Sequence, residues 1–167
     1  KLLPGLDPAL PFPIILVLHR KSGKDDILTN LLAGKTEMMV KEVEEKEEML
    51  PATIYIAPPN YHLLIENDHT FSLDASEKVN FSRPSIDVTF QSAAEVFKEN
   101  LVCLLLSGAN SDGSAGLKIV KEFGGAALVQ DPDSAVVSLM PESAIANVEV
   151  DAVLKSSEMS EYINNLP

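Results

Sequence analysis

Residues 101–116, LVCLLLSGANSDGSAG, decide the fold class of this chain because an apolar run, a polar loop and a helix start follow one another there. Residues 101–106 are apolar without a break, which is typical of a strand buried on both faces in a parallel sheet. The polar stretch 107–113 contains two glycines, an asparagine and an aspartate, which is typical of a loop. Residues 114–123 then have apolar side chains at helical spacing, and the glycines at 124–125 end the helix.

This strand, loop and helix form half of a βαβ unit, and the loops at the carboxyl ends of such strands are where open α/β sheets bind ligands. Asp112 lies in the loop and is therefore a candidate for chemistry. Two interpretations stay open from spacing alone. Asp112 could cap the helix that follows it, or its carboxylate could orient a histidine on a neighbouring strand end.

The rest of the chain repeats the alternation of short apolar runs and amphipathic segments, which predicts an α/β fold with a mainly parallel, doubly wound sheet. Residues 61–66 and 71–73 flank an Asn-Asp pair and predict a small β-hairpin. The expected strands are 14–18, 36–43, 53–57, 101–106, 126–129 and 148–153, and the expected helices are 27–32, 84–97, 114–123, 141–145 and 157–166.

Size, charge and composition narrow the class of protein. A chain of 167 residues is expected to form one domain with a substantial core. The net charge of -12 argues against binding to nucleic acid or to an anionic membrane surface. A single cysteine excludes an intramolecular disulfide and favours a reducing cytosol. No apolar run approaches the roughly 20 residues of a membrane span, so we expect no membrane insertion.

Three histidines are candidates for acid–base chemistry. His19 directly follows the expected strand 14–18, so it should lie at the carboxyl edge of the sheet. Position alone favours a histidine that simply hydrogen-bonds a neighbouring loop. His62, inside a short strand, is interpreted as a packed or capping residue, and His69, at a hairpin turn, as a solvent-exposed one.

The usual motifs for metals and cofactors are absent from the sequence. The glycines 108 and 113 have the spacing of a phosphate-binding loop, but Ser114 follows where that loop needs lysine. No histidines and cysteines have zinc spacing. Cys103, in the middle of an apolar run, is expected to be an inert core residue. We therefore predict neither a metal nor a cofactor.

Several motifs together resemble the chemotaxis protein-glutamate methylesterases of the CheB type. Residues 106–116, LSGANSDGSAG, are similar to the stretch Leu-Thr-Gly-Met-Gly-x-Asp-Gly-Ala-x-Gly of that family. The other matching pieces occur in the same order along the whole chain. They are PIILVLH (13–19), IYIAPPNYH (54–62), NFSRPSID (80–87), GG (124–125), QDP (130–132), SA (134–135) and MPESA (140–144).

The resemblance implies a three-layer α/β domain that hydrolyses methyl-esterified glutamates on the cytoplasmic helices of chemoreceptors and can deamidate glutamines there. It implies a Ser-His-Asp triad, in which His19 is the general base and Asp112 its orienting carboxylate. Gly108, Ala109 and Asn110 would line the site near the oxyanion. The partners would be the methylated receptor helices, and the location would be cytoplasmic.

The sequence also departs from the family. Ala109 and Asn110 stand where the family usually has Met-Gly, which affects the shape of the pocket. No serine between Lys1 and Pro167 lies in the Gly-x-Ser-x-Gly type of turn that carries the family's nucleophile. We expect that serine, with the first strand of the sheet, upstream of Lys1, since losing a serine nucleophile costs on the order of a million-fold in turnover.

Residues 1–167 include no receiver domain, which leaves control by a separate phosphorylated regulator open. Two other functions also remain open. One is a non-catalytic receptor-binding or scaffold module of the same fold. The other is a hydrolase of a different ester.

Overall fold

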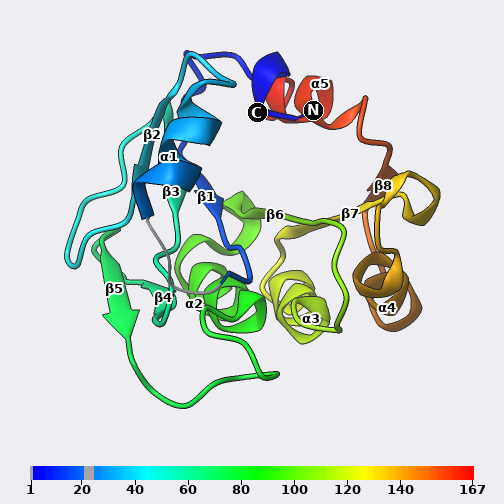
Figure 1. The fold of residues 1–167 in the computed structure, drawn as a ribbon. Coiled ribbons are helices and arrows are strands. Elements are labelled where there is room, and N and C mark those ends of the chain that lie inside the picture. Colours follow the sequence, from blue (N-terminus) through cyan, green and yellow to red (C-terminus); the bar gives the residue numbers. More distant parts are fainter. Residues whose placement is uncertain (1, 21–24) are drawn as a thin grey trace.

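The computed structural model describes residues 2–20 and 25–167, whose strands and helices alternate along the chain (Figure 1). The strands are β1 (Ile14–Leu16), β2 (Met39–Glu42), β3 (Thr53–Ile56), β4 (His62–Ile65), β5 (Phe71–Asp74), β6 (Val102–Leu105), β7 (Ala126–Gln130) and β8 (Ala152–Leu154). The α-helices are α1 (Asp25–Ala33), α2 (Ile86–Phe97), α3 (Ser114–Glu122), α4 (Leu139–Asn147) and α5 (Met159–Asn164), with short 3₁₀ turns η1 (Leu3–Gly5), η2 (Lys98–Asn100) and η3 (Pro132–Ser134).

The parallel strands divide between two three-stranded sheets, in the orders β1-β3-β2 and β6-β7-β8. Strand β3 is central in the first sheet and is buried along its whole length, as its run of β-branched and aromatic residues predicts. Strands β4 and β5 form the expected antiparallel hairpin. The fold is thus α/β with mainly parallel pairing, as the alternation of elements predicts.

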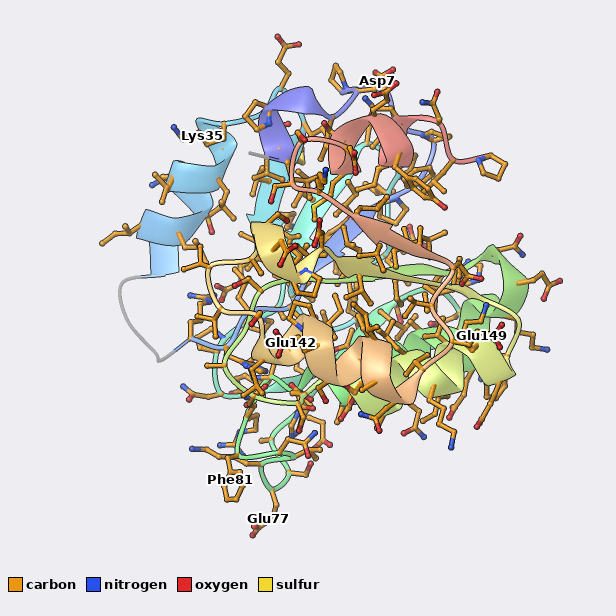
Figure 2. The ribbon with its side chains drawn as sticks, turned by 90° about the vertical axis from the view of Figure 1, so that its right-hand side faces the viewer. Asp7, Lys35, Glu77, Phe81, Glu142 and Glu149 are labelled. Atoms are coloured by element: carbon orange, nitrogen blue, oxygen red, sulfur yellow. The ribbon has the colours of Figure 1, made fainter. Side chains whose placement is uncertain are left out.

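Helices cover the strands from both sides, which gives three layers (Figure 1). Alternate residues of β6 and β7 point to opposite faces, so each face has its own core. One core joins β6 and β7 to α2, α3 and α4 and includes Ile86, Cys103, Leu105, Leu117, Val120, Val129, Met140 and Ala144. The opposite face packs against the N-terminal segment and α5 and includes Leu6, Leu10, Ile54, Leu128, Met159 and Ile163. Figure 2 shows Asp7 of that N-terminal segment beside α5.

Two strands are less buried than the sequence predicts. The apolar run 101–106 suggests burial on both faces, yet Val102 and Leu106 are each 37% exposed. All three residues of β1 are only partly buried. Within the described residues, β1 and β6 each pair on one side only, so each forms the edge of its sheet. An apolar sequence shows that a strand can be buried. How much of the strand is buried depends on whether neighbouring strands cover both of its edges.

The contact between α2 and α3 brings the first turns of these two helices together. A Cβ atom at Gly116 would lie 2.7 Å from Cβ of Phe90 and 3.0 Å from Cα of Asp87, so only glycine permits this approach. Gly113, with φ of 97°, turns the chain from the loop after β6 into α3. The N-terminal ends of α2 and α3 therefore meet at the carboxyl end of β6.

None of the helices formed by residues 2–20 and 25–167 combines the length and apolar character that crossing a membrane requires. The sequence also predicts a polar loop at 21–26. Residues 21–24 lie outside the described residues, and 25–26 belong to α1.

Candidate active site

His19 and Asp112 meet at the carboxyl ends of β1 and β6. The Nε2 atom of His19 lies 2.6 Å from Oδ2 of Asp112, although the two residues are 93 positions apart in the chain. The His19 side chain is 27% exposed, whereas that of Asp112 is fully buried. The pair thus joins a buried carboxylate to an imidazole that solvent can reach.

The Asp112 carboxylate accepts hydrogen bonds from side chains and from the backbone of α2. Besides His19, its donors are Ser85 Oγ (2.8 Å), Asn80 Nδ2 (3.1 Å) and the backbone N–H groups of Ile86 (2.7 Å) and Asp87 (3.1 Å). Burial by itself raises the pKa of this carboxyl. The hydrogen bonds from His19, the α2 backbone and Ser85 outweigh burial and hold the pKa of Asp112 at about 2. The group is therefore an anion over the whole physiological pH range.

The first of the two interpretations of Asp112 is wrong, because Asp112 does not cap the helix that follows it. Gly113 is the N-cap residue of α3, and it has no side chain of its own with which to cap the helix. Asp112 instead accepts the first backbone N–H groups of α2, where the helix dipole favours a negative charge. The contact with His19 is the one that the second interpretation requires, and the catalytic role remains a prediction.

The hydrogen bonds of His19 distinguish its two ring nitrogens. Because an ionised carboxylate only accepts hydrogen bonds, the neutral ring carries its proton on Nε2 and donates it to Asp112. The Nδ1 atom then carries a lone pair, which accepts only a long hydrogen bond from Asn110 Nδ2 (3.5 Å). This arrangement makes Nδ1 the nitrogen that can accept a proton from a reacting group.

The three residues predicted to line the oxyanion differ in what they can offer. The backbone N–H of Gly108 donates to the carbonyl of Val137 (3.1 Å), so it is already occupied. Ala109 is exposed. Asn110 uses its Oδ1 to accept the backbone N–H of Asp112 (3.0 Å), which leaves its amide NH₂ group beside His19. Of the three, Asn110 is the best-placed donor.

The other two histidines have the surroundings that the sequence predicts for them. His62 is 1% exposed; its Nε2 donates to the carbonyl of Glu77 (2.9 Å) and its Nδ1 accepts the N–H of Ser85 (3.2 Å). It is thus a packed residue that satisfies the backbone at the start of α2. His69 is exposed, and its ring stacks on Phe97 at 5.2 Å.

Sequence reasoning missed the residues that hold Asp112 from the α2 side. They are Asn80, Ser85 and Asp87, and all three fall inside the motif NFSRPSID, which marks the family but does not by itself reveal a contact with Asp112. Figure 2 shows the loop before α2 extending away from the layers, with Glu77 and Phe81 at its far end.

Within residues 2–20 and 25–167, no group of three or more His, Cys, Asp or Glu side chains is arranged to hold a metal ion. Cys103 is buried in the core, and burial raises the pKa of its thiol far above the ordinary value, so the thiolate does not form.

Comparison with known proteins identifies the class. The sequence profile of the CheB methylesterase family matches residues 1–163. The crystal structure of the Thermotoga maritima CheB methylesterase catalytic domain superimposes with a TM-score of 0.95 at 35% identity, over 99% of this chain and 89% of that one. The chain belongs to the CheB methylesterase family.

Individual relatives extend over nearly all of this chain. A Leptospira interrogans protein named protein-glutamate methylesterase/protein-glutamine glutaminase is 49% identical over 165 residues, which is 99% of this chain and 86% of the relative. The Thermotoga maritima protein of the same name is 35% identical over 168 residues, which is 49% of its own length.

Proposed function

We propose that this protein hydrolyses methyl esters of glutamate side chains on chemoreceptors, and deamidates glutamines there, by serine-hydrolase chemistry in which His19 is the general base. The observation that carries the proposal is the buried, ionised Asp112 bound to one nitrogen of the partly exposed His19 ring, with the other nitrogen left to react. The names of the relatives support the choice of substrate.

The nucleophile in this proposal is a serine supplied by a segment upstream of Lys1. In the part of the chain that the structure describes, β1 and β6 each lack a neighbouring strand on one side. This supports such an arrangement, because a further strand beside β1 would end next to His19. Its hydroxyl would give its proton to Nδ1 as Oγ attacks the ester carbonyl carbon. Collapse of the tetrahedral intermediate would release methanol, which takes that proton, and water would then repeat the sequence to free the glutamate carboxylate.

Asp112 contributes orientation and charge in this scheme. Its carboxylate holds the proton of the neutral ring on Nε2, and it stabilises the imidazolium that forms when Nδ1 takes up the serine proton. Deamidation follows the same steps, with ammonia as the leaving group in place of methanol.

Asn110 is assigned as a donor to the oxyanion, through the amide NH₂ that lies beside Nδ1. Losing one such donor costs about 100- to 1,000-fold in turnover. A loop with asparagine at this position would thus stabilise the intermediate by a side chain.

The proposed partners are the methylated cytoplasmic helices of chemoreceptors, which places the protein in the cytoplasm. Control by a separate phosphorylated regulator belongs to the same proposal. The net charge of -12 supports a protein partner over nucleic acid.

The test measures methanol release by the natural full-length protein from a receptor fragment that carries glutamate methyl esters. A serine-reactive fluorophosphonate should add one label to the same protein by intact mass, and His19→Gln should prevent the addition. His69→Gln is the matched control and should behave as the unmodified protein, because His69 is exposed at the hairpin turn.

Two results would contradict the proposal. Tight binding to the receptor fragment with neither methanol nor a label would establish the non-catalytic module. Rapid hydrolysis of small acyl esters, with none of the receptor methyl esters, would establish a hydrolase of another ester.

A further inference from the structure

A second carboxylate, that of Asp87, lies next to the one that holds His19. Its Oδ1 atom accepts the backbone N–H groups of Gly113 (2.9 Å) and Gly116 (2.6 Å), and its Oδ2 atom accepts Asn80 Nδ2 (2.6 Å). Asp87 belongs to the first turn of α2, yet both backbone groups that it binds belong to the start of α3. Asp87 therefore caps its neighbour and not its own helix.

Asp87 and Asp112 cap two helices reciprocally, because each accepts hydrogen bonds from the N-terminus of the helix beside the other. Asp112 stands just before α3 and accepts the first N–H groups of α2, while Asp87 stands in α2 and accepts the first N–H groups of α3. The close approach of the two helices at Gly116 makes this reciprocal capping possible. Each carboxylate thus lies at a helix N-terminus, where the dipole stabilises its charge.

Asp87 also reaches Asp112 by two routes. Through the backbone, it binds the N–H of Gly113, the residue directly after Asp112. Through a side chain, it accepts from the same Asn80 amide nitrogen that donates to Oδ1 of Asp112. One asparagine NH₂ group therefore bridges the two carboxylates, and its direction depends on both of them accepting.

This arrangement has an electrostatic cost. Burial raises the pKa of Asp87, and the negative charge of Asp112 raises it further, against the hydrogen bonds from Gly116, Asn80 and Gly113. An uncharged side chain could join two helices without this cost. A carboxylate differs in that it only accepts, so it forces the Asn80 amide to present NH₂ to both oxygens.

We propose that Asp87 is a positioning residue for the hydrolysis proposed above: by binding Gly113 and orienting Asn80, it sets the direction of the Asp112 carboxylate and thereby keeps the proton of His19 on Nε2. The inference rests on the proposed function for its catalytic consequence. Its structural consequence, the tautomer of His19, can be measured whether or not the ester is hydrolysed.

The experiment compares Asp87→Asn with the unmodified full-length protein. Asparagine keeps the shape and one accepting oxygen for Gly113 and Gly116, but its NH₂ group would face the NH₂ of Asn80, which must then turn away from Asp112. We expect kcat on the receptor methyl ester to fall roughly 100-fold with KM unchanged, as for a small misplacement of a reacting group. Nitrogen-15 NMR of the His19 ring should change from one tautomer to a mixture.

Asp151→Asn is the matched control. Asp151 likewise accepts a backbone N–H, that of Ala127 (2.7 Å), and also Lys121 Nζ (2.6 Å), but it lies beyond the other end of α3. We expect this variant to keep both the kcat and the ring signals of the unmodified protein. Asn80→Ala tests the side-chain route, and the double variant with Asp87→Asn should cost no more than the larger single effect.

Two outcomes would overturn the inference. If Asp87→Asn lowers only the melting temperature and leaves kcat and the His19 signals unchanged well below it, Asp87 merely joins two helices. If kcat falls while the ring stays in one tautomer, Asp87 acts by another route. A failure of the proposed function shows itself separately, as absence of methanol release by the unmodified protein, and the NMR comparison still decides the role of Asp87.

Discussion

His19 and His62 are the same type of side chain in two different hydrogen-bonding environments. His62 is buried and uses both ring nitrogens within the protein, one toward the carbonyl of Glu77 and one toward the N–H of Ser85. His19 uses Nε2 toward Asp112 and turns Nδ1 to a partly exposed loop. A histidine is available for proton transfer only when one nitrogen remains free to exchange its proton with a substrate.

The two regions are also connected. Ser85 donates its backbone N–H to His62 and its hydroxyl to Asp112 (2.8 Å), so the packed histidine supports the start of α2 on which Asp112 depends. The two histidines therefore belong to one hydrogen-bond network, in which His62 stabilises the fold and His19 is the proposed base. Substitutions should separate these two roles, and the largest effect is expected at His19.

Replacing His19 by glutamine should abolish activity while the fold persists. The amide of glutamine can still donate to Asp112, but it cannot take up a proton, so turnover should fall on the order of a million-fold. Methanol release and thermal unfolding measure the two effects. An active His19→Gln protein would show that another residue is the base and that His19 does not differ from His62 in its role.

Replacing Asp112 by asparagine should lower turnover roughly 10,000-fold, because an amide in this position favours the wrong tautomer of His19. The amide NH₂ would also meet backbone N–H groups of α2 that now have a carboxylate acceptor. Steady-state kinetics below the melting temperature separate the catalytic effect from the structural one. Activity near that of the unmodified protein would mean that Asp112 serves only the helix.

Replacing His62 by leucine should show the opposite pattern. It leaves the buried N–H of Ser85 without its partner, which costs about 1–3 kcal/mol. The carbonyl of Glu77 also loses its partner, but Glu77 is exposed to solvent and this loss should cost less. Denaturant unfolding measures this loss. Turnover per folded molecule should fall far less than in His19→Gln, and an equal fall would place His62 in the chemistry.

Acidification should weaken the fold through Asp112. Its pKa of about 2 in the folded protein lies below the ordinary 3.8, so the unfolded chain binds the proton more readily. The stabilisation, about 2 kcal/mol by the usual conversion of a pKa difference, is complete above pH 4 and is lost as the pH falls toward 2.

The measurement is the difference in unfolding free energy between the unmodified protein and Asp112→Asn from pH 5 to pH 2. Taking the difference removes the contributions of the groups that both proteins share. The gap should narrow with falling pH, and a constant gap would mean that the carboxylate is not specially stabilised.

The sequence by itself was enough to predict the order of strands and helices, the hairpin and the alternation that defines an α/β fold. It also singled out His19 and Asp112, because each follows an apolar run and residues at strand ends gather at one edge of a parallel sheet. Such signals are local: a strand, a helix and a turn each depend on neighbours within a few residues.

Only the tertiary structure decided which partner each polar group takes. Asp112 caps α2 and not its own helix, and Asp87 does the reverse for α3, through contacts that span 25 to 29 residues of the chain. The free nitrogen of His19 follows from a contact across 93 residues. The packing of α2 against α3 at Gly116 determines these pairings. Local sequence patterns cannot predict them, because they do not show which helix ends come into contact.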